Sequence, residues 1–275
     1  MKWLVIFAIC TSAGFAQEGS SQITKAEKRG KELVDQAIQA LGGDRFLNMQ
    51  DRVESGRAYS FYREQISGLS IAKIYTRYVT VAPDKTGSEV AQREREAFGV
   101  KEESAVMFNE SGGWEVNWRG AKDLPKDRVD RYRDTTLRNV LYIFRKRLKE
   151  PGMIFEGRGT DIFENHPIDI LDITDSENRV VTVYLEQSTH LPVRQVYRHI
   201  NPVDKRPDEE VTLYSRYRDV GGGVQWPLQM RRERNGEKVY EIYSETVEIN
   251  QDLTDELFTV PSGKDEPPPK QKKKK

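Results

Sequence analysis

Acidic side chains form the densest group of candidate metal ligands or acid–base catalysts in this sequence. Asp169, Asp172, Asp175 and Glu177 cluster around one predicted strand and the turn that follows it. A calcium loop arranges its oxygen ligands around a central glycine, which is missing here. The run Asp175-Ser176-Glu177-Asn178 is typical of a polar hairpin turn. We therefore interpret these carboxylates as part of a turn and predict no metal site.

The other residue types that perform catalysis have no matching pattern. His166, His190 and His199 are the three histidines, and their spacing does not indicate a metal site. The nucleophile elbow, the phosphate-binding loop and the zinc-protease motif are all absent from the sequence. Gly157-Arg158-Gly159 lacks the third glycine of a dinucleotide fingerprint and is better explained as a bulge in a strand. We predict no catalytic residue, no metal and no cofactor, and therefore a protein that is not an enzyme.

Large apolar residues are the stronger candidates for binding. Their spacing between Pro125 and Glu150 predicts one amphipathic helix, which Pro151-Gly152 ends. Such an apolar face either packs as core or closes a groove, and tryptophans suit a core or an apolar ligand cavity equally well. The candidate ligand-binding residues are Leu137, Val140, Leu141, Phe144 and Leu148 on this helix, with Trp114 and Trp226 elsewhere.

The elements that must position these residues are mostly strands. Alternating Val, Tyr, Leu and Ile with polar residues predicts the C-terminal strands 180–186, 193–200, 211–220, 225–233 and 238–249. Asn235-Gly236 is a strong signal for a two-residue hairpin. Upstream strands are predicted at 52–65, 69–81, 88–97, 105–109, 114–118, 154–163 and 167–174. Connections this short force antiparallel pairing, and about ten or eleven strands require a strongly curled sheet.

Between Ile23 and Gln50 the spacing is helical, with Leu33, Ala37 and Leu41 on one stripe. A glycine cap at Leu41-Gly42-Gly43 ends this helix, and Asp44 can cap a short second helix through Met49. Neither an internal repeat nor a linker rich in Gly, Pro or Ser divides the body of the chain. The sequence therefore predicts a single domain over residues 17–263.

The two ends of the chain have distinct compositions. Residues 1–16 combine Lys2, an apolar run and small residues near Ala16, as in a secretory signal peptide cleaved near Ala16. The only cysteine, Cys10, lies inside it, so a cleaved chain has no disulfide. Residues 264–275 are rich in Lys and Pro and are predicted to be disordered. This tail either solubilises the chain or makes peripheral contact with an anionic membrane.

Charge and composition exclude two classes of protein. The full chain of 275 residues has a formal net charge of zero and 32% charged residues. Without its basic tail the body is mildly acidic, so we predict no nucleic-acid partner. The charged fraction also excludes burial of the body in a membrane.

Four local motifs recur in a characteristic order: the Gly112-Gly113-Trp114 turn, Thr189-His190-Leu191-Pro192, the run 214–220 and Gln225-Trp226-Pro227. In this order they resemble the periplasmic LolA/LolB-like superfamily, whose members sort outer-membrane lipoproteins. It implies an α+β fold, mainly antiparallel β: a strongly curved, incomplete β-barrel with helices packed on the concave face. It also implies an apolar interior that accepts the acyl chain of a lipid or lipoprotein.

The sequence and this resemblance together predict an exported, periplasmic protein that binds or sorts a lipid or lipoprotein. The alternative is an envelope interaction or stress-sensor module, with the same fold, a protein partner and no lipid cargo. The many Arg and Tyr residues on the strands depart from a wholly apolar pocket.

Overall fold

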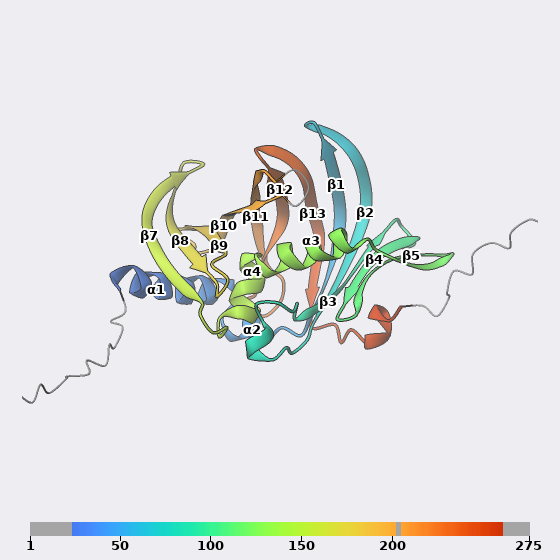
Figure 1. Ribbon diagram of the computed structural model, residues 1–275, viewed down its shortest axis with the longest axis horizontal. Helices are drawn as coiled ribbons and strands as arrows, with labels where there is room; N and C mark the ends of the chain where they lie inside the picture. The colour runs from blue at the N-terminus through green and yellow to red at the C-terminus, as the bar shows by residue number, and fades with distance from the viewer. Residues whose placement is uncertain (1–23, 202–204, 261–275) are drawn as a thin grey trace, which may run out of the picture.

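A computed structural model describes residues 24–201 and 205–260. The predicted signal peptide and the Lys-rich tail both lie outside the described residues. The described chain forms one antiparallel sheet of 13 strands in the order β6-β5-β4-β3-β2-β1-β13-β12-β11-β10-β9-β8-β7. Within this sheet β6 and β7 are the two ends and do not pair with each other, so the barrel is open (Figure 1).

The strands follow the order along the chain that the alternating patterns predict. Their bounds are β1 (Asp51–Tyr62), β2 (Gln65–Tyr78), β3 (Gln92–Phe98), β4 (Ser104–Asn109), β5 (Gly112–Asn117), β6 (Gly120–Asp123), β7 (Ile154–Phe163), β8 (His166–Thr174), β9 (Val180–Glu186), β10 (Pro192–Ile200), β11 (Pro207–Asp219), β12 (Gln225–Arg234) and β13 (Glu237–Ile249).

Turn residues explain most of the hairpins. Asn235 and Gly236 both have positive φ, 51° and 82°, as a tight two-residue hairpin between β12 and β13 requires. Thirteen strands form within the described residues, against about ten or eleven expected. Twelve of them correspond to the predicted ranges. The strand without a predicted range, β6, has the sequence Gly-Ala-Lys-Asp, which carries no alternating apolar pattern and pairs only because the turn after β5 returns it to that strand.

Helix α1 (Lys25–Leu41) is the predicted N-terminal helix. Thr24 and Glu27 form a capping box at its start, and Gly42, with φ 121°, ends it. A Cβ atom at Gly30 would meet the backbone of Phe155 at 2.2 Å, so α1 lies directly against the edge strand β7. It lies below the β7–β9 end of the sheet (Figure 1), where it covers an edge that would otherwise be open to pairing. The short helix α2 (Asp44–Asn48) follows it.

The prediction of one continuous helix from Pro125 to Glu150 is wrong. The segment divides into α3 (Lys126–Leu137), α4 (Val140–Tyr142) and a π-helical turn, η2 (Ile143–Arg147). Asn139 has extended backbone angles, and its Oδ1 accepts hydrogen bonds from the backbone N–H groups of Leu141 and Tyr142 at 3.0 and 3.2 Å. Asn139 therefore caps the new helix α4, and these local side-chain hydrogen bonds separate it from α3. Two 3₁₀ turns, η1 (Pro83–Lys85) and η3 (Asp255–Phe258), complete the fold.

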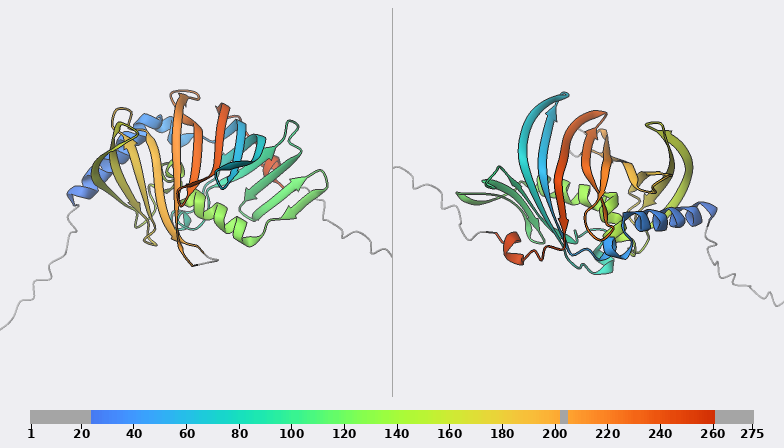
Figure 2. Two further views of the ribbon diagram at one scale, coloured as in Figure 1. Left: turned by 90° about the horizontal axis from the view of Figure 1, so that it is seen from above. Right: turned by 180° about the vertical axis from the view of Figure 1, so that it is seen from behind.

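The sheet bends around these helices. Seen from above, α3 runs along the concave side of the arc (Figure 2). Backbone N–H of Val140 donates to Oε1 of Gln195 on β10 at 2.8 Å, which fixes α4 to that same face. The predicted α+β fold, a curved and incomplete barrel with helices on its concave face, is confirmed.

Candidate functional site

Strand register assigns each side chain to one of the two faces of the sheet. Directly paired residues share a face. One row on the helix-covered, concave face is Leu171, Val183, Gln195, Thr212, Arg232 and Tyr240. The neighbouring row, Ile170, Tyr184, Arg194, Leu213, Arg231, Glu241 and Tyr59, lies on the opposite face, here called the outer face.

The predicted ligand-binding residues lie in three different places. Val140, Leu141, Phe144 and Trp226 are buried in the main core, and Leu148 packs against it partly exposed. Leu137 is buried in a small separate cluster with Ala91 and Tyr142. Trp114 packs against a third cluster, formed by β3, β4, β5 and η3. The structure thus brings five of the seven together and leaves Leu137 and Trp114 apart from them.

The main core joins the α4–η2 segment to α1 and to the β9–β11 part of the concave face. Leu33 and Val34 of α1 and Val183 of β9 belong to the same cluster as Leu141 and Phe144. Tyr214 O–H donates to Oε1 of Gln195 at 2.7 Å, the same oxygen that anchors Val140. The apolar face of the predicted helix therefore packs on the concave side as expected. Whether Leu141 and Phe144 also touch an acyl chain stays a prediction.

A buried ionic network holds the end of η2. The guanidinium of Arg147, 1% exposed, donates to both carboxylate oxygens of Glu150 at 2.7 and 2.9 Å and to Asp175 at 3.0 Å. Arg147 also donates to the backbone carbonyl of Leu137, and Arg179 donates to Asp175 at 2.7 Å. Asp175, predicted as a turn residue, does occupy a turn, where its Oδ1 accepts from the backbone N–H groups of Glu177 and Arg179. Its second role, as an anion for Arg147, depends on tertiary contact.

The β1–β3 part of the concave face is charged rather than apolar. We call Arg52, Glu54, Glu94, Glu96 and Arg232 the concave charge cluster. Arg52 lies 4.2 Å over the ring of Trp226 and 3.4 Å from Glu54. Burial, followed by repulsion from Glu96, raises the pKa of Glu94 to about 8, although Arg52 and Arg232 oppose the shift. Burial likewise raises the pKa of Glu96.

Helix α3 covers this cluster through polar and aromatic contacts. The ring of Tyr132 stacks on Phe108 of β4 with centroids 3.7 Å apart. The side-chain amide of Gln92 lies between two groups: its Nε2 donates to Tyr132 Oη at 3.2 Å and to Glu94 Oε2 at 3.1 Å. The only fully buried residue of α3 is Leu137. An acyl chain would therefore meet charge at this end of the concave face and apolar side chains only near α4.

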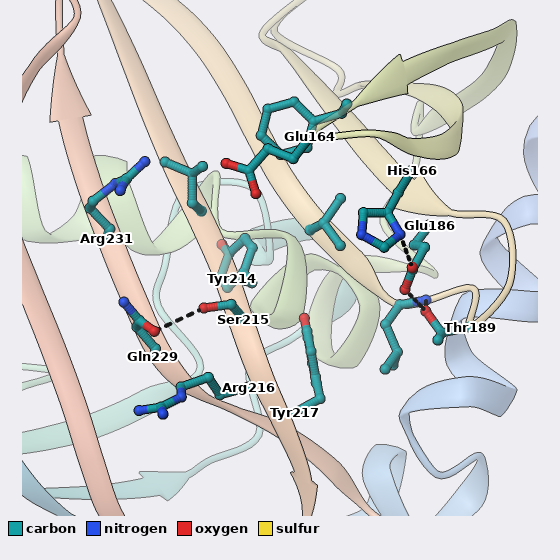
Figure 3. Close-up of a pocket in the computed structure, with 14 residues that line it drawn as sticks. Glu164, His166, Glu186, Thr189, Tyr214, Ser215, Arg216, Tyr217, Gln229 and Arg231 are labelled. Atoms are coloured by element: carbon teal, nitrogen blue, oxygen red, sulfur yellow. Dashed lines mark hydrogen bonds and ion pairs between the residues drawn. The ribbon is translucent and has the colours of Figure 1, made fainter.

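The outer face has a groove of about 480 Å³ between the β7–β8 hairpin and strands β9 to β12 (Figure 3). We call it the outer groove. It is lined by Phe163, Glu164, His166, Glu186, Thr189, Leu191, Val193, Leu213, Tyr214, Ser215, Arg216, Tyr217, Gln229 and Arg231. The site prediction included none of these residues. Their sequence pattern is an ordinary strand alternation, so a groove becomes visible only when the β7–β8 hairpin is placed over β10 and β11.

The described residues hold no group of three or more His, Cys, Asp or Glu arranged to bind a metal ion. His166 instead lies 3.1 Å from Glu186 at the edge of the outer groove. Searched over the same residues, no helix combines the length and apolar character needed to cross a membrane.

Comparison with known proteins identifies the fold. No protein-family model matches the chain, and no curated protein matches it in sequence. Among solved structures, a DUF1329 family protein from Desulfovibrio piger is similar, with a TM-score of 0.55 and 14% identity over 84% of this chain and 97% of that one. A putative outer membrane lipoprotein-sorting protein domain from Vibrio parahaemolyticus is similar with a TM-score of 0.53 and 9% identity, over 85% and 97%. Identities this low show the fold alone: this chain shares the fold of these two structures, one of them a lipoprotein-sorting domain, in agreement with the fold that the sequence resemblance implies.

Proposed function

We propose that this chain is a periplasmic protein that binds the acyl chain of a lipid or lipoprotein within its half-barrel. The observation that carries the proposal is the set of apolar side chains on the α4–η2 segment, among them Leu141 and Phe144, which pack against the β9–β11 part of an open, concave sheet. A curved sheet that does not close can admit an apolar ligand where a helix is displaced from it. The Vibrio protein is described as lipoprotein-sorting, which supports the proposal by analogy of fold.

The concave charge cluster limits the part of the concave face on which an acyl chain can bind. A carboxylate or guanidinium loses hydration if hydrocarbon covers it, so an acyl chain avoids the β1–β3 end. Leu141 and Phe144 lie at the opposite, apolar end and are the residues expected to contact the chain.

Native mass spectrometry of the purified mature protein, followed by solvent extraction, tests the proposal. We expect bound lipid in the wild-type protein and less in a folded Leu141→Ala and Phe144→Ala double variant. Val100→Ala is the control, because Val100 is 80% exposed and belongs to no apolar cluster. Wild-type protein that carries no lipid and takes up none from vesicles would contradict lipid binding.

A second function, an envelope interaction module without lipid cargo, is favoured by a different observation. Ile66, Leu69 and Ile71 are large apolar residues that are exposed on β2, and their partners Phe61, Tyr59 and Arg57 place them on the outer face. Exposed apolar patches often mark contacts with another protein. Cross-linking in intact cells tests this function: a Leu69→Lys and Ile71→Lys variant should lose a partner that the wild-type chain retains.

A further inference from the structure

The outer groove contains one residue whose backbone is held in an unfavourable conformation. Arg216 has φ 58°, in the left-handed region that side chains other than Gly, Asn and Asp rarely adopt. Ser215 pairs with Gln229 and Tyr217 with Pro227, so the strand register is the same on both sides of Arg216. Strained conformations of this kind concentrate at functional sites. The side chain of Arg216 lines the outer groove.

Arg216 is also the cation of this groove that is left without a partner. Within the described residues it makes no hydrogen bond or ion pair, and it is exposed. The other polar groups beside it are occupied. Gln229 Nε2 donates to Glu241 and to Tyr243 Oη, both at 2.9 Å, and its Oε1 accepts from Ser215 at 3.2 Å. Arg231 pairs with Glu233 at 2.9 Å. The guanidinium of Arg216 is therefore available to an anion.

Apolar side chains extend from Arg216 along the groove. Leu213 and Val193 are half-buried, Leu191 is 9% exposed, and Phe163 overhangs from the β7–β8 hairpin. A volume of about 480 Å³ lies within the range of roughly 300–1,000 Å³ that small-molecule sites occupy. The groove therefore combines one available cation with an apolar surface long enough for a chain.

The acidic residues of the groove lie away from Arg216 and orient a ligand. Glu186 already lies 3.1 Å from His166 Nδ1 and accepts from Thr189 Oγ1 at 2.7 Å. Glu164 is exposed at the tip of the β7–β8 hairpin, across the groove from Arg216 (Figure 3). An anionic head is repelled by Glu164 and attracted by Arg216, so the charged head belongs at the Arg216 end.

From these contacts we propose that the outer groove binds an anionic amphiphile, with its carboxylate on Arg216 and its chain along Leu213, Val193 and Leu191 toward Phe163. This site lies on the face of the sheet opposite the α4–η2 segment, so it is a second binding site, separate from the one proposed on the concave face. It assigns to the ligand a negative head as well as an apolar chain.

The test is isothermal titration calorimetry of the mature protein with three probes: palmitate, hexadecanol and acetate. Palmitate should bind. Hexadecanol lacks the charge and acetate lacks the chain, so each should bind at least about tenfold more weakly, by loss of a charge-assisted hydrogen bond or of buried apolar surface.

Substitutions then locate the site. Arg216→Asn removes the charge but keeps a residue that tolerates the left-handed conformation, and it should weaken palmitate binding about ten- to a hundredfold. Arg216→Lys should retain most of the affinity. Leu213→Gln should weaken binding of palmitate and of hexadecanol alike. Arg218→Asn is the matched control, because Arg218 is exposed on the same strand and does not line the groove.

The outcomes separate this site from the proposed function. Palmitate binding that is unchanged in Arg216→Asn, or lost equally in Arg218→Asn, contradicts the proposal that palmitate binds in the outer groove. If palmitate binding survives Leu213→Gln and disappears in the Leu141→Ala and Phe144→Ala variant, the chain lies on the concave face. Binding in the outer groove is then contradicted, and the proposed function stands. A wild-type protein that binds neither palmitate nor vesicle lipid overturns both.

Discussion

Replacing Glu94 by glutamine should stabilise this protein, and more so as the pH rises. Glu94 is half-buried on the concave face beside Glu96, and burial followed by that repulsion raises its pKa from an ordinary 4.5 to about 8. The folded protein therefore keeps Glu94 protonated up to a higher pH than the unfolded chain does. Glutamine has nearly the shape of the protonated acid, and its amide still offers an oxygen to the Gln92 Nε2 that now donates at 3.1 Å.

The sign of the pH effect follows from proton binding. Between pH 4.5 and about 8 the folded chain binds a proton at Glu94 that the unfolded chain releases, so the free energy of unfolding falls as the pH rises through this window. The full pKa shift corresponds to an upper limit of about 5 kcal/mol. Because Glu94 is only half-buried and the cations Arg52 and Arg232 remain nearby, water and counter-charge screen much of this, and we expect about 2 kcal/mol.

The assay is urea unfolding of wild-type, Glu94→Gln and Glu115→Gln proteins at pH 5, 7 and 9. The difference in unfolding free energy between Glu94→Gln and wild type should be small at pH 5 and should reach about 2 kcal/mol in favour of the variant at pH 9. Glu115 is exposed on β5, so its substitution should have no comparable effect. A Glu94→Gln difference that is constant from pH 5 to 9, or that shrinks, refutes the assignment of Glu94 as a protonated, buried acid.

The remaining predictions concern packing, strain and export. Leu141→Ala should lower the unfolding free energy by about 2–5 kcal/mol in urea, because Leu141 is fully buried; a loss well under 1 kcal/mol would show that α4 is not part of the core. Arg147→Met should cost about 3–5 kcal/mol, because it leaves Glu150 buried without its cation and Asp175 with Arg179 alone, and a neutral result in the same assay would contradict that network. Arg216→Gly should raise the thermal midpoint, with a gain of about 1 kcal/mol from relief of the left-handed conformation at φ 58°; a lower midpoint would mean that the arginine side chain stabilises the fold. N-terminal sequencing of protein recovered from the periplasm should begin near Gln17, and retention of the initiating methionine would exclude cleavage.

The two faces of this sheet carry different chemistry, and both constrain the ligand. The concave face is apolar only between β9 and β11, where α1 and α4 cover it, and becomes charged toward β3. The outer groove combines apolar side chains with Arg216, whose guanidinium makes no hydrogen bond or ion pair within the described residues. The Arg and Tyr residues noted in the sequence as a departure from an apolar pocket thus occupy defined positions on both faces.

Local patterns were enough to predict the strands and their antiparallel order. Alternation over 180–186 and 238–249, with Asn235-Gly236 between strands, depends only on neighbouring residues, and each of these strands forms within two residues of its predicted bounds. The cap at Gly42 is similarly local. The break at Asn139 was missed, although Asn before an apolar run is a capping signal, because the apolar spacing continues across it in the sequence.

The candidate sites depended on tertiary structure. Sequence alone predicted that Leu141 and Phe144 form an apolar face, which helical spacing decides. It could not predict that Leu137 and Trp114 belong to other clusters, because the break in the helix and the order of strands in the sheet separate them. Glu94 and Arg216 lie in unremarkable strand sequences. Burial and the neighbouring Glu96 give Glu94 its raised pKa. Arg216 lines a groove that exists only because the distant β7–β8 hairpin lies beside β10 and β11. Such properties depend on which groups fold together, and no local pattern encodes them.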